Sequence, residues 1–234
     1  MAYLSRGHRT RAGFATPVRG RPVAFRCVRS APQTAPDTLP AARPLRAWQR
    51  SALTRYLASG PQDFLAVATP GAGKTAFALR VAAELLADRV VQAVTVVTPT
   101  EHLKHQWAQA AEAVGIGLDP EFRNSAGGTS ADYTGIAVTY AGVAAHPLLH
   151  RARTENRRTL VVLDEIHHAG DARSWGEAVQ EAFGPATRRV ALTGTPFRSD
   201  DNPIPFVEYA PDGEGAMRSR ADHSYGYAAA LADG

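Results

Sequence analysis

The sequence is poor in cysteine and lysine, and it contains no long hydrophobic run. One cysteine, Cys27, stands among 234 residues, so a disulfide within the chain is excluded and a reducing compartment, the cytoplasm, is expected. No uninterrupted apolar stretch approaches the ~18 residues that a membrane-spanning helix needs, and we expect no membrane partner. No spacing of cysteine and histidine resembles a zinc site. A hydrophobic fraction of 44% nevertheless suits a sizeable core.

Acidic residues are nearly missing from residues 1–43, which biases the charge of the whole chain. That segment holds eight arginines and one acid, Asp37, so its net charge is +7, which leaves −3 for the other 191 residues out of a total of +4. The basic balance therefore says nothing about a nucleic-acid surface on the folded part. Composition predicts that residues 1–43 form a disordered arm. The arm could tether phosphate backbones, serve as an organelle transit peptide or be a featureless extension, and we favour the last because arginine outnumbers lysine throughout.

Short apolar runs alternate with helix-like segments from residue 64 onward. The predicted strands are 64–68, 93–98, 135–139, 159–163 and 189–193. The predicted helices are 73–87, 101–114, 143–153 and 174–183. Continuous apolar strands of this kind are buried on both faces, as in a parallel sheet, and the alternation predicts a doubly wound α/β domain. Such a domain binds its ligands at the carboxyl ends of the strands.

A glycine-rich turn lies between the first predicted strand and the first predicted helix. From position 68 it reads Ala-Thr-Pro-Gly-Ala-Gly-Lys-Thr, with alanine where the strict phosphate-loop pattern has glycine. The two glycines allow successive N–H groups to face a β-phosphate, and the helix N-terminus adds partial positive charge. Lys74 is expected to reach the β- and γ-phosphates, and the Thr75 hydroxyl to hold Mg²⁺. The predicted nucleoside triphosphate loop comprises Pro70, Gly71, Ala72, Gly73, Lys74 and Thr75.

Two carboxylates follow the strand predicted at 159–163. Asp164 and Glu165 are unfavourable at the end of a buried strand unless a cation or a reaction uses them. We interpret Asp164 as a Mg²⁺ ligand that acts through the water shell of the ion, and Glu165 as the base that orients and deprotonates the attacking water. A solvated acidic pair is the ordinary alternative. The spacing of about ninety residues from the phosphate loop is typical of neighbouring strands in one ATPase sheet, and together the two motifs favour an ATP hydrolase.

The sequence Asp-Glu-Ile-His at 164–167, downstream of the phosphate loop, resembles the first RecA-like motor domain of superfamily-two helicases and translocases of the DExH type. Further segments match that family in the same order: Leu-Arg-Ala-Trp-Gln at 45–49, Val-Thr-Pro-Thr at 97–100 followed by Leu103, Gln106 and Trp107, Val-Thr-Tyr at 138–140 and Leu-Thr-Gly-Thr-Pro at 192–196. The resemblance covers about residues 45–198 and is closest to DNA-directed, restriction-subunit-like members of the DEAD/DEAH group. It implies a RecA-like fold, ATP and Mg²⁺ as ligands, and DNA rather than RNA as the polymer.

The same resemblance implies roles for single residues. It assigns adenine reading to Gln49, for which an exposed helical glutamine is the ordinary alternative. Three threonines are expected to contact the nucleic-acid backbone, although threonine at strand ends is also routine turn chemistry: Thr98, Thr100 and Thr139. His167 is implied to link the hydrolysis site to Thr193 and Thr195, in the segment that couples hydrolysis to movement.

Residues 44–200 carry the predicted ATP-binding domain, and residues 201–234 read as loop and partial connector. Helicases of this family hydrolyse ATP between two motor domains, and the second supplies an arginine finger worth about 10³–10⁵ in rate. No pattern for that second domain is present, so we expect a fragment, a shortened reading frame, or a chain that needs the second domain in cis or trans. Alone it is expected to bind ATP weakly and hydrolyse it slowly. A non-catalytic module that binds ATP and nucleic acid is the alternative, whereas a small-molecule kinase fits the motifs poorly.

Overall fold

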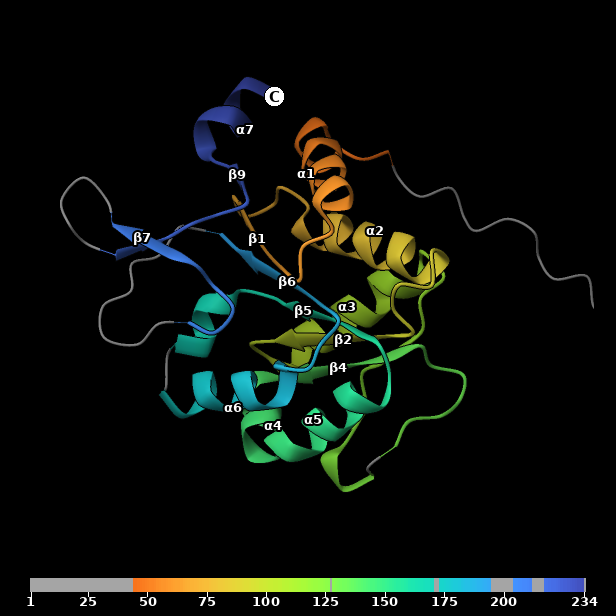
Figure 1. Ribbon diagram of the computed structural model, residues 1–234. Helices are drawn as coiled ribbons and strands as arrows, with labels where there is room; N and C mark the ends of the chain where they lie inside the picture. The colour runs from red at the N-terminus through yellow and green to blue at the C-terminus, as the bar shows by residue number, and fades with distance from the viewer. Residues whose placement is uncertain (1–43, 127, 171–172, 195–203, 212–216, 234) are drawn as a thin grey trace, which may run out of the picture. The chain divides into compact units, whose positions relative to one another are not determined.

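Parallel strands form the centre of the protein in the computed structural model, which describes residues 44–126, 128–170, 173–194, 204–211 and 217–233 (Figure 1). Seven of them share one sheet in the order β3-β4-β2-β5-β6-β1-β9, and every neighbouring pair is parallel. Their bounds are β1 Asp63–Ala68, β2 Ala93–Thr98, β3 Leu118–Asp119, β4 Gly135–Thr139, β5 Thr159–Leu163, β6 Arg188–Thr193 and β9 His223–Tyr225. The predicted α/β class with a mainly parallel sheet is confirmed.

Helices cover both faces of this sheet (Figure 1). One face carries α1 (Ala47–Ser59), α2 (Lys74–Ala87) and α3 (Glu101–Glu112), and the other carries α4 (Tyr140–Ala145), α5 (Pro147–Asn156) and α6 (Arg173–Phe183). The alternation of side chains along each strand supplies both cores, because successive residues point to opposite faces. In β1, Phe64 and Ala66 pack on the first face, whereas Leu65 and Val67 pack on the second.

The five predicted strands are present, each within one residue of its predicted start and with the predicted end. The single helix predicted at 143–153 is wrong in detail, because two helices occupy that region. They meet at His146, which has φ −145° and ψ 60°, and α5 begins with Pro147. Proline disfavours helical backbone at the preceding residue and lacks an N–H, so it ends one helix and starts the next.

The C-terminal region contains regular structure where the sequence predicted only loop and connector. β7 (Tyr209–Pro211) and β8 (Met217–Ser219) form an antiparallel pair, and α7 (Tyr227–Asp233) follows β9. β9 extends the main sheet beside β1. Two 3₁₀ helices complete the described elements, η1 (Asn124–Ala126) and η2 (Ile166–Gly170). The predicted arm, residues 1–43, and the predicted site residue Thr195 lie outside the described residues.

Candidate active site

The turn between β1 and α2 has the backbone shape that its glycines predict. Gly71 and Gly73 have φ of 76° and 89°, in the left-handed region that favours a residue without Cβ. The N–H of Ala72 donates to the carbonyl of Thr69 at 3.1 Å, which closes the turn. α2 begins immediately afterwards at Lys74. The strand, the turn and the helix N-terminus therefore follow one another as a phosphate-binding loop requires.

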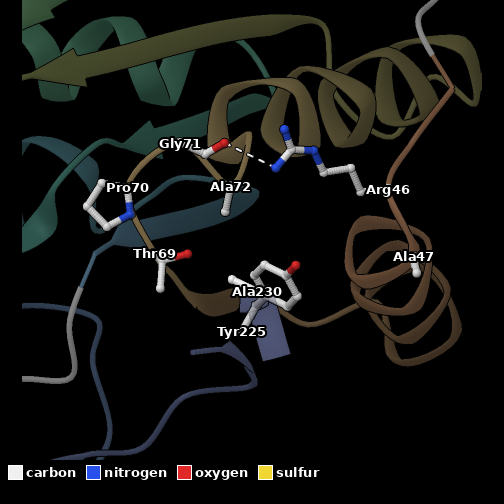
Figure 2. A pocket seen from close by; sticks show the side chains of 8 residues that line it. All are labelled: Arg46, Ala47, Thr69, Pro70, Gly71, Ala72, Tyr225 and Ala230. Carbon is white, nitrogen blue, oxygen red and sulfur yellow. Dashed lines mark hydrogen bonds between the residues drawn. The ribbon is translucent and has the colours of Figure 1, made fainter. Parts of the chain in front are cut away.

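Side chains from the N-terminal end of α1 hold three successive carbonyls of this turn. The pairs are Arg46 to Gly71 at 3.2 Å, Trp48 to Ala72 at 3.0 Å and Gln49 to Gly73 at 2.8 Å, and Figure 2 shows the first of them. In a trans peptide group, the N–H of one residue points in the opposite direction to the carbonyl of the residue before it. The N–H groups of Gly73 and Lys74 therefore point away from α1.

Gln49 is buried, with 3% of its surface exposed, so the alternative of an exposed helical glutamine is wrong. Its carbonyl oxygen accepts from the backbone N–H of Arg46 at 2.7 Å, while its amide nitrogen donates to Gly73. A Cβ at Gly73 would lie 2.6 Å from that amide nitrogen. Gln49 thus fits closely against the phosphate loop, and its assignment to adenine stays a prediction.

The acidic pair lies directly after β5. The spacing predicted neighbouring strands for the loop and the pair, which is wrong, because β6 lies between β1 and β5. Asp164 is buried, and its Oδ2 accepts a hydrogen bond from the Trp107 indole at 2.8 Å. The Tyr140 hydroxyl donates to the backbone carbonyl of Asp164 at 3.0 Å. Burial raises the pKa of the Asp164 carboxyl, as does the charge of Glu165, while the Trp107 hydrogen bond and the charge of Lys74 lower it. The carboxylate is held firmly although it is largely shielded from water.

Glu165 joins the acidic pair to the phosphate loop. Its Oε1 lies 2.9 Å from the ammonium of Lys74, which also donates to the carbonyl of Ala68 at 3.2 Å. Its Oε2 accepts from the backbone N–H of Gly194 at 3.1 Å. Glu165 has φ 47°, which is uncommon for a residue with a side chain and is found at functional sites. This conformation lets the chain turn out of β5 while the carboxylate faces Lys74.

His167 lies between Glu165 and the end of β6. Its Nδ1 is 3.2 Å from the Thr193 hydroxyl and 3.5 Å from Oε2 of Glu165. Thr193 is fully buried and is the last residue of β6. His167 thus lies next to both Glu165 and Thr193, and its role in linking hydrolysis to movement stays a prediction.

The three threonines expected to contact nucleic acid are occupied by local hydrogen bonds. Thr98, at the end of β2, is fully buried and donates to the carbonyl of Thr100 at 3.0 Å. Thr100 accepts from the backbone N–H of Leu103 at 3.4 Å and caps α3. Thr139 accepts from the N–H of Gly142 at 3.1 Å and caps α4. The turn chemistry that the sequence offered as an alternative is observed, and contact with nucleic acid stays a prediction.

The predicted site residues form two groups. The phosphate loop with Gln49, the acidic pair, His167 and Thr193 gather at the ends of β1, β5 and β6. Pro70 and Gly71 are exposed there, and Thr75 is half-buried in the first turn of α2. The threonines form the second group, on β2 and β4. No group of three His, Cys, Asp or Glu side chains suited to a metal occurs within the described ranges. None of the helices in those ranges is long and apolar enough to cross a bilayer.

A pocket of about 520 Å³ opens beside the phosphate loop. It is lined by Arg46, Ala47, Thr69, Pro70, Gly71, Ala72, Tyr225 and Ala230, as Figure 2 shows. The Tyr225 ring stacks on Trp48 at 5.4 Å between centroids, and its carbonyl accepts from the N–H of Thr69 at 3.2 Å. Sequence reasoning missed Tyr225, and it treated Trp48, Trp107 and Tyr140 only as matches to a pattern. The aromatic residues inside the matched segments were the signal that could have found the last three.

Comparison with known proteins gives matches in sequence. Residues 43–198 match the family described as "Type III restriction enzyme, res subunit". The chain is 69% identical over 191 residues to the uncharacterized protein Rv2917 of Mycobacterium tuberculosis H37Rv, which covers 82% of this chain and 32% of that protein. The chain thus spans about a third of the length of the curated relatives it matches.

Solved structures share the fold at low sequence identity. The SWI2/SNF2 ATPase core of Sulfolobus solfataricus, solved in complex with dsDNA, aligns with a TM-score of 0.54 and 20% identity over 66% of this chain and 32% of that one. The ATP-dependent type ISP restriction-modification enzyme LlaBIII, solved bound to DNA, aligns with a TM-score of 0.56 and 14% identity over 81% of this chain and 16% of that one. The predicted likeness to RecA-like helicase motor domains is confirmed.

Proposed function

The chain belongs to the family of the res subunit of type III restriction enzymes, and we propose that it is the ATP-hydrolysing domain of a DNA helicase or translocase. The ion pair between Lys74 and Glu165, at 2.9 Å, carries this proposal. Phosphate loops and acidic strand ends each occur in proteins of many functions. Their contact in one site puts a phosphate-binding ammonium next to a carboxylate that can act on water.

The phosphate loop supplies the binding energy for a triphosphate. The N–H groups of Gly73 and Lys74 point away from α1, and the N-terminus of α2 adds partial positive charge. Gln49 already uses one donor and one acceptor within the protein, and a carboxamide retains a second N–H and a second lone pair. We assign this remaining pair to an adenine edge, which makes ATP the nucleotide.

The oxygen donors near the loop fit Mg²⁺. This ion is bound in nucleotide sites by one or two protein oxygens together with waters and phosphate oxygens, rather than by a cage of side chains. Asp164 supplies a buried carboxylate, Thr75 supplies a hydroxyl in the first turn of α2, and the described residues form no larger acidic cluster. When bound, Mg²⁺ neutralises charge on the phosphates.

Glu165 is the residue that we propose as the base. A γ-phosphate in the loop would compete for the Lys74 ammonium and release Oε1 of Glu165 to accept a proton from water. The backbone N–H of Gly194 and the nearby Nδ1 of His167 keep Oε2 in place during that exchange. Because His167 also reaches Thr193, movement at the end of β6 would change the position of the base.

Nucleic acid is proposed to lie across the ends of β2 and β4. The exposed Thr100 and the nearby Thr139 mark this edge, while the buried Thr98 shapes the turn that presents it. DNA is favoured because the SWI2/SNF2 core and LlaBIII were both solved with DNA. The arginine finger would come from a second motor domain, in cis or in trans. The single cysteine keeps the cytoplasm as the proposed compartment.

The test is ATP hydrolysis by the purified chain, measured with and without Mg²⁺ and with single-stranded DNA, double-stranded DNA or RNA. Glu165→Gln should lower turnover by about 10²-fold or more, since general-base catalysis contributes about 10²–10⁴-fold. Glu112→Gln, an exposed position on α3, is the matched control and should keep parent turnover. ATP binding with no turnover above Glu165→Gln would favour the non-catalytic binding module. Failure to bind ATP would refute the site itself.

A further inference from the structure

The indole of Trp107 reaches the acidic pair from α3. Trp107 lies on α3, is 2% exposed, and donates from Nε1 to Oδ2 of Asp164 at 2.8 Å. The two residues are 57 positions apart, so only the packing of α3 against the sheet brings them together. An indole is a donor without any acceptor capacity, and it cannot exchange roles with the carboxylate. The contact therefore fixes one oxygen of Asp164.

Tyr140 fixes the backbone of the same residue. It is the first residue of α4, is fully buried, and its hydroxyl donates to the carbonyl of Asp164 at 3.0 Å. The backbone N–H of Asp164 donates to the carbonyl of Val97 in β2 at 2.9 Å. The side chain, the carbonyl and the N–H of Asp164 are thus each held by a different element.

Trp107 and Tyr140 both direct a buried donor at Asp164. Apolar rings would satisfy packing alone, whereas a buried indole or phenol must be given a hydrogen-bond partner, and here both polar atoms are directed at one aspartate. The partner of Trp107 is the carboxylate of Asp164, and the partner of Tyr140 is the backbone carbonyl of the same residue. Ligands of metals are oriented by partners behind them, and loss of such a partner typically lowers metal affinity about 10–100-fold.

We propose that Trp107 and Tyr140 are positioning residues that hold Asp164 in the orientation that binds the Mg²⁺–nucleotide complex. This inference rests on the proposed function, because it assumes that Asp164 serves a metal. Trp107 fixes the carboxylate, and Tyr140 fixes the backbone from which the carboxylate projects. Trp107 lies on α3 and Tyr140 on α4, outside the phosphate loop, so their removal should leave metal-free binding to that loop intact.

The experiment measures the Kd of a fluorescent ADP analogue for the full chain in Mg²⁺ and in EDTA. Trp107→Phe keeps an aromatic ring in the core and removes the donor. The Kd of Trp107→Phe in Mg²⁺ should be about tenfold higher than that of the parent, whereas its Kd in EDTA should equal that of the parent. Trp175→Phe, the same change at a half-buried site on α6, is the matched control and should behave as the parent.

Tyr140→Phe provides a second variant that removes one oxygen atom and no ring, so it retains the core even if Trp107→Phe does not fold. It should weaken Mg²⁺-dependent binding in the same direction and leave binding in EDTA unchanged. The inference would be overturned if a folded Trp107→Phe protein showed the Mg²⁺ dependence of the parent. If Trp107→Phe does not fold, the same result in Tyr140→Phe would overturn it. Either result would leave the proposed function standing. A parent without Mg²⁺-dependent nucleotide binding would overturn both.

Discussion

Substitution of Gly73 by alanine tests whether α1 sets the shape of the phosphate loop. Gly73 has φ 89°, and an alanine in the left-handed region costs about 1–2 kcal/mol. Its Cβ would also lie 2.6 Å from Nε2 of Gln49, so the amide must leave a buried position. Displacement breaks the hydrogen bond to the Gly73 carbonyl and endangers the one from the Arg46 N–H, and each buried group left unpaired costs about 1–3 kcal/mol. We expect the free energy of unfolding to fall by about 2–5 kcal/mol in total.

Gly71→Ala separates the two effects. Gly71 has φ 76°, close to that of Gly73, but nothing lies within 4 Å of its Cβ position. Gly71→Ala should therefore lower the free energy of unfolding only by the cost of the left-handed backbone, about 1–2 kcal/mol. Both alanines restrict the unfolded chain to the same extent, so this contribution cancels in the difference.

Urea denaturation of the parent and both variants measures the difference, and titration with a fluorescent ADP analogue measures its effect on binding. Gly73→Ala should be less stable than Gly71→Ala by more than about 1 kcal/mol, and it should bind nucleotide more weakly. In the Gly73→Ala background, Gln49→Ala should restore part of the stability, because it removes the clash. Equal stability of the two glycine variants would refute the reasoning that Gln49 limits the loop.

Two further predictions concern the core. Burial lowers the pKa of His150 to about 4 from its usual 6.5, so the unfolded chain takes up the proton first as the pH falls. The free energy of unfolding should therefore decrease from pH 6.5 towards pH 4, by at most roughly 3 kcal/mol. Urea denaturation across that range should show this slope, and His150→Gln should flatten it. Arg189→Met removes a side chain, 6% exposed, that binds Asp63 and two backbone carbonyls. It should lower the free energy of unfolding by about 2–3 kcal/mol, less than for a fully buried pair, because Asp63 is partly solvated. Arg80→Met, at an exposed helical pair, should change it by less than about 0.5 kcal/mol, and equal losses in the two variants would contradict a stabilising role for the Arg189 pair.

Local signals were enough to predict the main strands and the centre of the site. The runs at 93–98, 135–139 and 159–163 are apolar or β-branched and are bounded by turn residues, and each forms the predicted strand. The glycines of the predicted phosphate loop and the acidic pair form motifs that are recognised by residue type and spacing. Such features can be recognised before any tertiary contact is known.

Features that depend on tertiary contact were not predicted. β9 has only three residues, and its position is set by backbone hydrogen bonds and by Asp222, which exchanges two hydrogen bonds with Leu65. The burial of Gln49 depends on the loop across from it. The donation from Trp107 to Asp164 depends on how α3 packs, and no spacing in the sequence encodes it.

The pairing of β9 explains why alanine is accepted at position 68, where the strict phosphate-loop pattern has glycine. Ala68 pairs with Tyr225 of β9 and is the last residue of β1. It therefore belongs to the strand and not to the turn that follows it. Extended backbone suits any L-residue, and the methyl group of Ala68 is fully buried in the core shared with Trp48. Ala68 contacts Lys74 through its backbone carbonyl, which accepts from the ammonium and is independent of the side chain at position 68. The demand for glycine begins only at Gly71, where φ becomes positive. The α1 side chains and β9 therefore fix the loop from both sides, and they confine the need for glycine to the residues between them.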